Sequence, residues 1–247
     1  MLEKEQYNRI KKGRLYIPLD INTNSIIYKN RLELIKFPAK DVILSSNLEE
    51  ILQYIDEKNI DCCVKSNTLI YRKGDFVGYK IKFYRDYKSL RKLLNKNFIL
   101  KKQYCKNIEG TFNILTENNL EIFDYSLSNI LLNKEGKVLV CDLDGLKIIN
   151  DSNLDRKNRK NLFILTLAYL YKFHVNDVKI LLRHGSQFLV QNNECLIQLF
   201  NRIDNDEKVS VENLLEIINE YDVKKMRKRL KCDLDFLQDS GYYKRYF

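Results

Sequence analysis

The first third of the chain alternates apolar and polar positions over short runs, a pattern typical of half-buried β-strands. The tetrapeptide Arg72–Asp75, between two such runs, supplies the turn of a hairpin. We therefore expect a small antiparallel sheet in this region. Its strands lie in the runs RLYIPLDI, SIIYK, LELIKF and TLIYRKGDFVGYKIKFY, at residues 14–21, 25–29, 32–37 and 68–84.

Helical spacing first appears inside this region, in the segment SSNLEEILQYIDEKN at residues 45–59. Its apolar residues recur on one helical face, and Ser46 or Asn47 is a suitable N-cap. From Ser89 onward the helical pattern dominates, in SLRKLLNK, in residues 98–118, in LFILTLAYLYKF and in SVENLLEIINEYDVKKMRKRL. The chain is therefore expected to be α+β, with a β-rich part at residues 1–84 that carries one helix and an α-rich part at residues 85–247.

One stretch, IFDYSLSNILLNKEGKVLVCDLDG, interrupts the helical pattern with a predicted hairpin that has an amide and three carboxylates at its ends. Pairing Asn133 with Val138 across the turn KEGK places Asn129 opposite Asp142. These two oxygen ligands are then close enough to share a hard cation such as Mg²⁺. Asp124, on the loop that enters the hairpin, could face the same space. Asp and Asn also favour turns at strand ends, so the pattern alone leaves a purely structural interpretation open.

The formal net charge of +10 permits an acidic partner, such as a nucleotide, a nucleic acid or a membrane surface, without choosing among them. The densest basic run is KKMRKRLK at residues 224–231. We interpret it first as a solvated helix face and second as a contact for nucleic acid or lipid. Nucleic-acid binding would therefore rest on charge alone.

Cysteine usage and apolar segments indicate the compartment. The six cysteines contain no CxxC pair and form no metal-like cluster with the only histidines, His174 and His184, which we interpret as structural. The first ten residues, MLEKEQYNRI, lack the apolar core of a signal peptide. The longest apolar run, at residues 162–171, is too short to cross a bilayer. These features predict a reduced, cytoplasmic protein without a membrane span.

Two motifs at the ends of the hairpin give the chain a resemblance to the protein kinase superfamily. DYSLSN, at residues 124–129, resembles the catalytic loop, in which an aspartate is followed five residues later by an asparagine. DLDG, at residues 142–145, resembles the metal-binding DFG motif. The resemblance extends over roughly residues 10–220 and implies a bilobal kinase-like fold. Residues 1–84 would form a small N-terminal lobe that binds nucleotide, and residues 85–247 a larger helical C-terminal lobe, together one domain.

The resemblance also implies roles for the residues of these motifs. Asp124 would orient the attacking hydroxyl or accept its proton. Asn129 and Asp142 would hold Mg²⁺ against the phosphates of ATP. Asp144 would either add a carboxylate near the metal or cap the turn with Gly145, and the second role is the first choice.

Residues of the N-terminal part acquire roles in the same way. Lys36, in the run LELIK, would bind the α- and β-phosphates. Its helix partner would be Glu49 or Glu50, and the sequence leaves both open. Lys82 and Phe83, in KIKFYRD, would form the hinge, where backbone groups bind adenine.

Several features of the family are missing from this chain. The turn DINTNS, at residues 20–25, contains no glycine where the family has a glycine-rich phosphate loop. Ile122 and Phe123 replace the His-Arg pair that precedes the catalytic aspartate, which suggests that no phosphorylated activation loop acts as a switch. Only a short segment without an APE motif follows Gly145, so the platform for a peptide substrate is short or absent.

The function predicted from the sequence is therefore an ATP- and Mg²⁺-dependent phosphotransferase that acts on a hydroxyl. A protein serine or threonine is expected as acceptor ahead of a small molecule. The missing features favour an alternative, a pseudokinase or interaction module that binds a nucleotide or a partner without catalysis.

Overall fold

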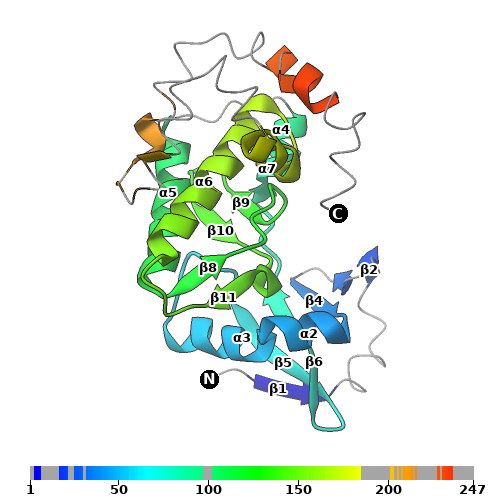
Figure 1. The fold of residues 1–247 in the computed structure, drawn as a ribbon. Coiled ribbons are helices and arrows are strands. Elements are labelled where there is room, and N and C mark those ends of the chain that lie inside the picture. Colours follow the sequence, from blue (N-terminus) through cyan, green and yellow to red (C-terminus); the bar gives the residue numbers. More distant parts are fainter. Residues whose placement is uncertain are drawn as a thin grey trace.

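The protein has an α+β fold in which a six-stranded sheet and a group of helices lie on either side of several short strands (Figure 1). This computed structural model describes residues 3–6, 17–21, 25–29, 32–96, 102–184, 201–202, 205, 207, 209–213, 215, 227–228 and 230–235. Every structural statement below concerns these residues.

The six-stranded sheet has the order β1-β5-β6-β4-β3-β2. Its strands are β1 (Glu3–Gln6), β2 (Ile17–Ile21), β3 (Ser25–Lys29), β4 (Glu33–Pro38), β5 (Ser66–Arg72) and β6 (Asp75–Lys82). The predicted turn between β5 and β6 is confirmed, because Lys73 and Gly74 adopt the positive φ values, 55° and 96°, that a two-residue turn requires. The expected antiparallel sheet is confirmed for β2 to β6, and β1, which was not expected, adds a parallel pair with β5 at the edge. The sequence of β1, EKEQ, contains no apolar residue, so its hydrophobic pattern gave no sign of a strand.

Two helices, not the single one expected, connect β4 and β5. They are α2 (Lys40–Ser46) and α3 (Leu48–Glu57), and the chain breaks between them at Asn47, whose φ of 50° is left-handed. Neither Ser46 nor Asn47 caps α3 through its side chain, because the Ser46 hydroxyl donates instead to the carbonyl of Val42 at 2.7 Å. The apolar face of α3 is buried as its spacing predicted, at Leu48, Ile51, Leu52 and Ile55.

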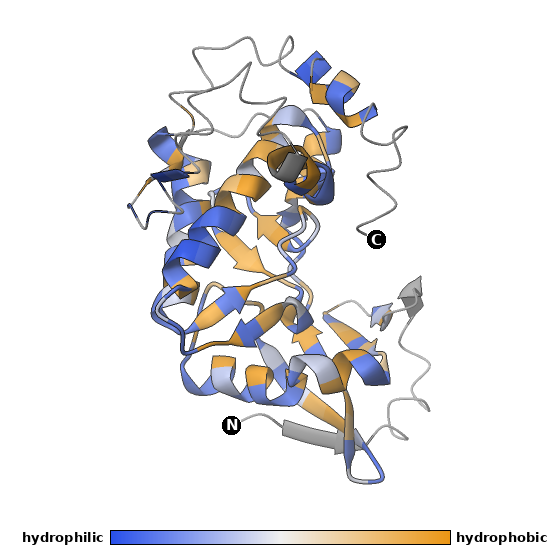
Figure 2. Ribbon diagram, in the orientation of Figure 1, coloured by the Kyte–Doolittle hydropathy of each residue, from blue (hydrophilic) through white to orange (hydrophobic). Residues whose placement is uncertain are grey.

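The helical part consists of α4 (Leu90–Asn95), α5 (Lys102–Glu117), α6 (Leu154–Tyr171) and α7 (Val175–His184). Helix α6 packs against both α5 and α7, and it is apolar along its C-terminal half (Figure 2). Every residue from 162 to 169 is buried, which confirms the prediction of a buried helix there. No helix of the described chain combines the length and apolar character that crossing a membrane requires.

Predictions for the C-terminal region fall largely outside the described residues. Of the helix expected at residues 210–230, the described residues 211–213, 215, 227–228 and 230 are helical. In the basic run 224–231, Arg227, Lys228 and Lys231 are exposed on a helical segment while Leu230 is buried, as on a solvated helix face. Residues 22–24 of the glycine-free turn also lie outside the described chain.

Short strands connect the sheet and the helices. Strands β9 (Ile130–Leu132) and β10 (Val138–Val140) form the predicted hairpin, which β7 (Lys88–Ser89) extends to three strands. Strands β8 (Leu120–Ile122) and β11 (Leu146–Ile148), which the sequence did not predict, form a second antiparallel pair. The N–H of Val64 donates to the carbonyl of Val140 at 2.9 Å, and one continuous apolar core extends from α3 through β10 to α6.

The predicted register of the hairpin is wrong by one residue. Val138 pairs with Leu132 and not with Asn133, which leaves residues 134–136 as the connecting loop. The N–H of Gly136 donates to the carbonyl of Asn133 at 3.2 Å. The N–H of Asn133 in turn donates to the carbonyl of Lys137 at 3.1 Å. Gly136 has φ = 86°. This is a type I turn closed by a left-handed glycine, so the glycine and not the loop length set the register.

The corrected register keeps Asn129 and Asp142 at the same end of the hairpin without pairing them directly. Cys141 lies opposite Asn129, and its N–H donates to the Asn129 carbonyl at 2.9 Å. Asp142 follows immediately and begins the short 3₁₀ turn η1 (Leu143–Gly145). The Asn129 amide and the Asp142 carboxylate are therefore at the same end of the hairpin, although the two residues are not cross-strand partners.

Candidate functional site

Lys36 meets the DLDG motif across the boundary between the sheet and the short strands. It lies on β4 and is only 8% exposed. Its Nζ contacts the Oδ1 of Asp142 and lies 2.5 Å from the Oδ1 of Asp144, although these residues are more than 100 positions away in the chain. Three of the residues singled out from the sequence are thus in direct contact.

The turn η1 explains how two carboxylates of one tetrapeptide reach the same amine. Leu143, between them, is fully buried, and it anchors the turn in the core. The N–H of Gly145 donates to the carbonyl of Asp142 at 3.2 Å, which closes the turn. Asp144 therefore lies beside Lys36, so its role is not limited to capping the turn.

Burial and charge determine the ionisation of these three groups. Burial raises the pKa of Asp142 to about 7, and a hydrogen bond with Asp144 adds to the rise. Burial also opposes ionisation of Asp144, but its hydrogen bond with Asp142 and the charge of Lys36 bring its pKa below the usual value. Burial alone would lower the pKa of Lys36, yet the two carboxylates raise it overall and keep the amine charged. Asp144 thus balances Lys36, while Asp142 holds a proton for part of the time near neutral pH.

Asp124 is exposed on the loop after β8 and is fixed against the same turn. The backbone N–H groups of Phe123 and Asp124 both donate to the carbonyl of Gly145, at 3.0 and 3.3 Å. A Cβ on Gly145 would lie 2.9 Å from the Cβ of Asp124, closer than real Cβ atoms approach. Glycine at position 145 is therefore what lets the aspartate approach the turn.

Asn129 supports the loop through its amide. The side chain is buried, and its Nδ2 donates to the backbone carbonyl of Asp124 at 3.0 Å. Its Oδ1 accepts no hydrogen bond from the described residues and remains available as a ligand. The spacing of five residues between Asp124 and Asn129 therefore has a structural explanation. It allows the Asn129 side chain to hold the loop through Nδ2 while its Oδ1 stays available.

Two asparagines of α6 hold β8 in place, and no pattern in the sequence had pointed to the first of them, Asn158. The buried side chain of Asn158 accepts from the N–H of Ile122 at 3.2 Å and donates to the carbonyl of Leu120 at 2.8 Å. Asn161 donates to the carbonyl of Ile122 at 2.8 Å. Because β8 leads directly into the Asp124 loop, these amides fix the position at which that loop begins.

These groups surround a cavity of about 410 Å³, which we call the acidic cavity. It is lined by Ser25, Lys36, Val42, Ser45, Ser46, Phe123, Asp124, Asp142, Asp144 and Gly145. Its volume lies within the range of about 300–1,000 Å³ that is typical of small-molecule sites. Asn129 does not line it, so the only oxygens that DLDG and the Asp124 loop expose there are carboxylate and backbone oxygens.

The donor set fits a magnesium ion that is shared with phosphates. Within the described chain, no group of three or more His, Cys, Asp or Glu side chains is arranged to hold a metal ion by itself. Mg²⁺ does not need one, because it binds through one or two carboxylates together with substrate phosphates and water. Asp142 and Asp144 supply such carboxylates at the cavity wall.

The structure does not show the expected glutamate partner of Lys36. Neither Glu49 nor Glu50 pairs with Lys36, since Asp142 and Asp144 already occupy the amine. Glu49 accepts a hydrogen bond from the hydroxyl of Tyr71 at 2.5 Å, and Glu50 is exposed.

The predicted hinge is also partly occupied by the protein itself. The N–H of Phe83 donates to the carbonyl of Leu32 at 2.7 Å, so this backbone donor is not free for a base. The ring of Phe83 lies under the Nζ of Lys29, 3.8 Å from the ring centroid. Lys82, at the end of β6, is exposed.

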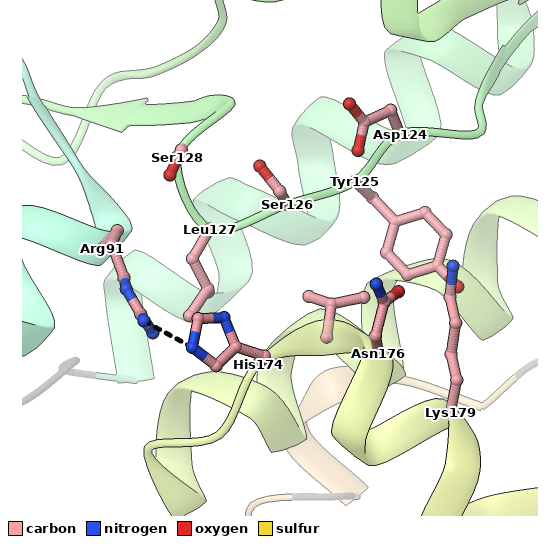
Figure 3. A pocket seen from close by; sticks show the side chains of 10 residues that line it. Arg91, Asp124, Tyr125, Ser126, Leu127, Ser128, His174, Asn176 and Lys179 are labelled. Atoms are coloured by element: carbon pink, nitrogen blue, oxygen red, sulfur yellow. Dashed lines mark hydrogen bonds between the residues drawn. The ribbon is translucent and has the colours of Figure 1, made fainter. Parts of the chain in front are cut away.

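A second cavity, of about 190 Å³, adjoins Asp124 from the helical side, and we call it the basic cavity (Figure 3). It is lined by Arg91, Asp124, Tyr125, Ser126, Leu127, Ser128, His174, Val175, Asn176 and Lys179. The sequence analysis interpreted His174 as structural and did not consider Arg91. Arg91 and His174 lie 83 positions apart in the chain, so no local spacing indicates that they are partners.

Comparisons with known proteins add no assignment. The chain matches no model of a known protein family and no curated protein. The functional argument therefore depends on the geometry of the residues described above.

Proposed function

We propose that the protein is an ATP- and Mg²⁺-dependent phosphotransferase of the protein kinase-like type that transfers the γ-phosphate to a hydroxyl. The observation that supports this most is the convergence of Lys36, Asp124 and Asp142 on one cavity. These residues come from the sheet, the loop after β8 and the turn after β10. They are the same residues that resemble the phosphate-binding lysine, the catalytic aspartate and the metal-binding aspartate of protein kinases.

The proposed reaction needs positioning and charge neutralisation more than covalent help from the protein. Asp124 orients the acceptor hydroxyl and takes its proton as the oxygen attacks the γ-phosphorus. A new O–P bond forms, the bond between the γ-phosphorus and the β–γ bridging oxygen breaks, and ADP leaves. Lys36, released from the carboxylates when nucleotide enters, binds the phosphates.

Asp142 and Asp144 would hold Mg²⁺, which when bound neutralises phosphate charge, and Asn129 would support them by fixing the Asp124 loop. Ionic contacts between the carboxylates and Lys36 keep these groups together before the substrate arrives. We further propose the bilobal arrangement of the family, with residues 1–84 as the N-terminal lobe and 85–247 as the C-terminal lobe. The position of the acidic cavity between β4 and η1 supports that division.

Transfer of label from γ-labelled ATP tests the proposal. The purified protein is incubated with labelled ATP and Mg²⁺, alone and with fractionated cell extract, beside the variants Asp142→Ala and Glu135→Ala. Wild type and Glu135→Ala, which changes an exposed residue at the hairpin tip, should both transfer label to an acceptor. Asp142→Ala should not. If Asp142→Ala transfers label as fast as wild type, the proposed site is wrong.

A pseudokinase or interaction module is the second candidate function. It is favoured by the occupied N–H of Phe83 and by the two carboxylates that already hold Lys36. Thermal unfolding with and without ATP and Mg²⁺ separates a protein that binds nucleotide from a module that does not, and label transfer separates a catalyst from a pseudokinase that binds nucleotide. ATP and Mg²⁺ together should raise the unfolding temperature of a catalyst. An interaction module that does not bind nucleotide should show no change in unfolding temperature, either in wild type or in Asp142→Ala.

A further inference from the structure

Asp124 lines both the acidic and the basic cavity, so it lies where the two spaces meet. Under the proposed function, the phosphates and the metal occupy the acidic side. The hydroxyl that Asp124 orients must then approach from the other side, which is the basic cavity. The lining of that cavity therefore indicates what kind of acceptor carries the hydroxyl.

Arg91 contributes a positive charge to this lining that no carboxylate of the described residues balances. Its Nη2 lies 2.9 Å from the Nε2 of His174, and no ion pair forms with it. Because a guanidinium only donates, Nε2 of His174 accepts and the imidazole carries its proton on Nδ1. The arginine is thus held in place by a neutral partner, and its remaining N–H groups keep their capacity for an anion.

The backbone fixes Arg91 relative to the catalytic loop. Its N–H donates to the carbonyl of Leu127 at 2.9 Å, three residues after Asp124. Figure 3 shows Arg91 and His174 meeting at one end of the loop Asp124–Ser128, with Tyr125 and Lys179 at the other. The position of the guanidinium is therefore set by the same loop that carries Asp124.

Lys179 of α7 adds a second positive charge at the opposite end. Its Nζ lies over the ring of Tyr125, 4.3 Å from the centroid, which keeps the amine at the cavity wall. Among the described residues that line the cavity, Asp124 is the only carboxylate, and the residues other than Asp124, Arg91 and Lys179 carry no charged carboxylate, amine or guanidinium. Arg91 thus adds a positive charge to a lining whose one carboxylate, Asp124, is assigned to the hydroxyl.

We propose that the basic cavity binds the anionic group of a small acceptor, an alcohol that carries a phosphate or a carboxylate, and that Arg91 is its principal ligand. This inference rests on the proposed function and specifies its substrate class. The acceptor's anion pairs with Arg91 while its hydroxyl faces Asp124. Bidentate contacts of a guanidinium with phosphate or carboxylate provide both affinity and orientation.

The size of the cavity favours a small molecule over a protein segment. Its 190 Å³ corresponds to the share of about six water molecules in liquid water. That space holds an anionic group and a few carbon atoms, but it is below the range of about 300–1,000 Å³ of sites for drug-sized ligands. The short segment after Gly145, without an APE motif, also leaves no evident platform for a peptide. These observations move the expected acceptor from a protein side chain to a small hydroxylated anion.

Nuclear magnetic resonance of the imidazoles measures anion binding without nucleotide. The chain has two histidines, so the His174 resonance is identified by its retention in a His184→Gln variant. Glycerol 3-phosphate, glycerate and glycerol are titrated separately into the full-length protein. We expect glycerol 3-phosphate or glycerate to shift the His174 resonance saturably, and the stronger of the two identifies the anion. Glycerol should leave it unchanged.

Two glutamine substitutions on α4 complete the test. Arg91→Gln removes the charge but keeps a donor for His174, and Lys92→Gln removes an exposed charge at the next position. Arg91→Gln should weaken binding of the anion by about tenfold or more, and Lys92→Gln should leave it within about twofold. No saturable shift with either anion, or equal binding by Arg91→Gln and wild type, would overturn the inference.

The outcomes for this inference and for the proposed function can be told apart. Saturable, Arg91-dependent anion binding without any label transfer from ATP supports the anion site and counts against the phosphotransferase. Label transfer to glycerol or to a protein, with a KM that Arg91→Gln does not change, supports the phosphotransferase and overturns the anion site.

Discussion

Asp124 lines two cavities whose walls carry opposite charge. On the acidic side, Lys36 faces Asp142 and Asp144, and all three charged groups contact one another. On the basic side, Arg91 faces a neutral histidine, and no carboxylate of the described chain pairs with it. The acidic cavity thus suits a cation together with phosphates, while the basic cavity suits an anion alone.

The two cavities also differ in how the chain builds them. The acidic cavity joins residues from the sheet, from α2 and from η1, so it depends on the packing of the N-terminal sheet and α2 against the DLDG turn. The basic cavity is built from α4, the Asp124 loop and the start of α7. Substitutions that disturb one cavity should therefore leave the other largely intact, which makes the difference between them testable.

Gly145→Ala should have the largest effect, because it disturbs the residue that both cavities share. The new Cβ would lie 2.9 Å from the Cβ of Asp124 and push that loop outward. A displacement of about 1 Å of a catalytic group costs about 100-fold in rate. We expect the rate of phosphate transfer to fall by about this factor while the dissociation constant of Mg²⁺-ATP changes little. A parallel loss of nucleotide affinity would show that the substitution disrupts more than Asp124.

Lys36→Met should affect only the acidic cavity. Loss of a charge-assisted contact with phosphate costs about 2 kcal/mol, so calorimetry should find Mg²⁺-ATP binding about 30-fold weaker. Lys65→Met, at an exposed lysine that pairs with Asp61, serves as the matched control. Glycerol 3-phosphate binding should be unchanged in both variants. Equal weakening of both ligands by Lys36→Met would argue against two separate sites.

Asn158→Ala should act on stability through the support of β8. It leaves the buried N–H of Ile122 and the carbonyl of Leu120 without their partner, at a cost of about 2 kcal/mol in the free energy of unfolding. Asn113→Ala, at an exposed position of α5, should change that free energy by less than about 0.5 kcal/mol. Urea denaturation monitored by circular dichroism measures both. Similar values for the two variants would mean that the Asn158 amide does not hold the strand.

Two glycines remote from both cavities should give the smallest effects, with opposite signs. Gly136→Ala forces a side chain into a left-handed turn, and its Cβ would lie 2.8 Å from the amide of Asn107, so the free energy of unfolding should fall by about 1 kcal/mol. Gly110→Ala fills open space inside α5 and should raise it by about 0.5–1 kcal/mol. Neither should change phosphate transfer. Stabilisation by Gly136→Ala would contradict the assigned turn.

Local patterns in the sequence predicted most of the elements. Apolar alternation located β2 to β6 and the β9–β10 hairpin, and helical spacing located α3 to α6, although α6 begins at Leu154, well before the apolar run that predicted it. The same reasoning failed where the structure depends on the backbone. It missed the polar strand β1, the break at Asn47 and the pairing of β8 with β11, because none of these requires an apolar period.

The candidate site was likewise predicted from the sequence only in part. The sequence predicted that Asp124 and Asp142 face the same space, and both line the acidic cavity. Lys36, which was predicted to lie on a strand of the N-terminal sheet, lines the same cavity. The exact register was missed, because it depends on the left-handed Gly136 rather than on the number of turn residues. Arg91 and His174 come together only in three dimensions, so no local pattern of the sequence could join them.

The most direct test of the whole account is phosphate transfer by Asp124→Ala, compared with wild type under saturating Mg²⁺-ATP. Asp61→Ala, at a residue whose side chain is 73% exposed, is the matched control. The account predicts that Asp124→Ala binds Mg²⁺-ATP as tightly as wild type but transfers label at least about 100-fold more slowly, as expected for loss of a general base. Transfer by Asp124→Ala at the rate of wild type would contradict it.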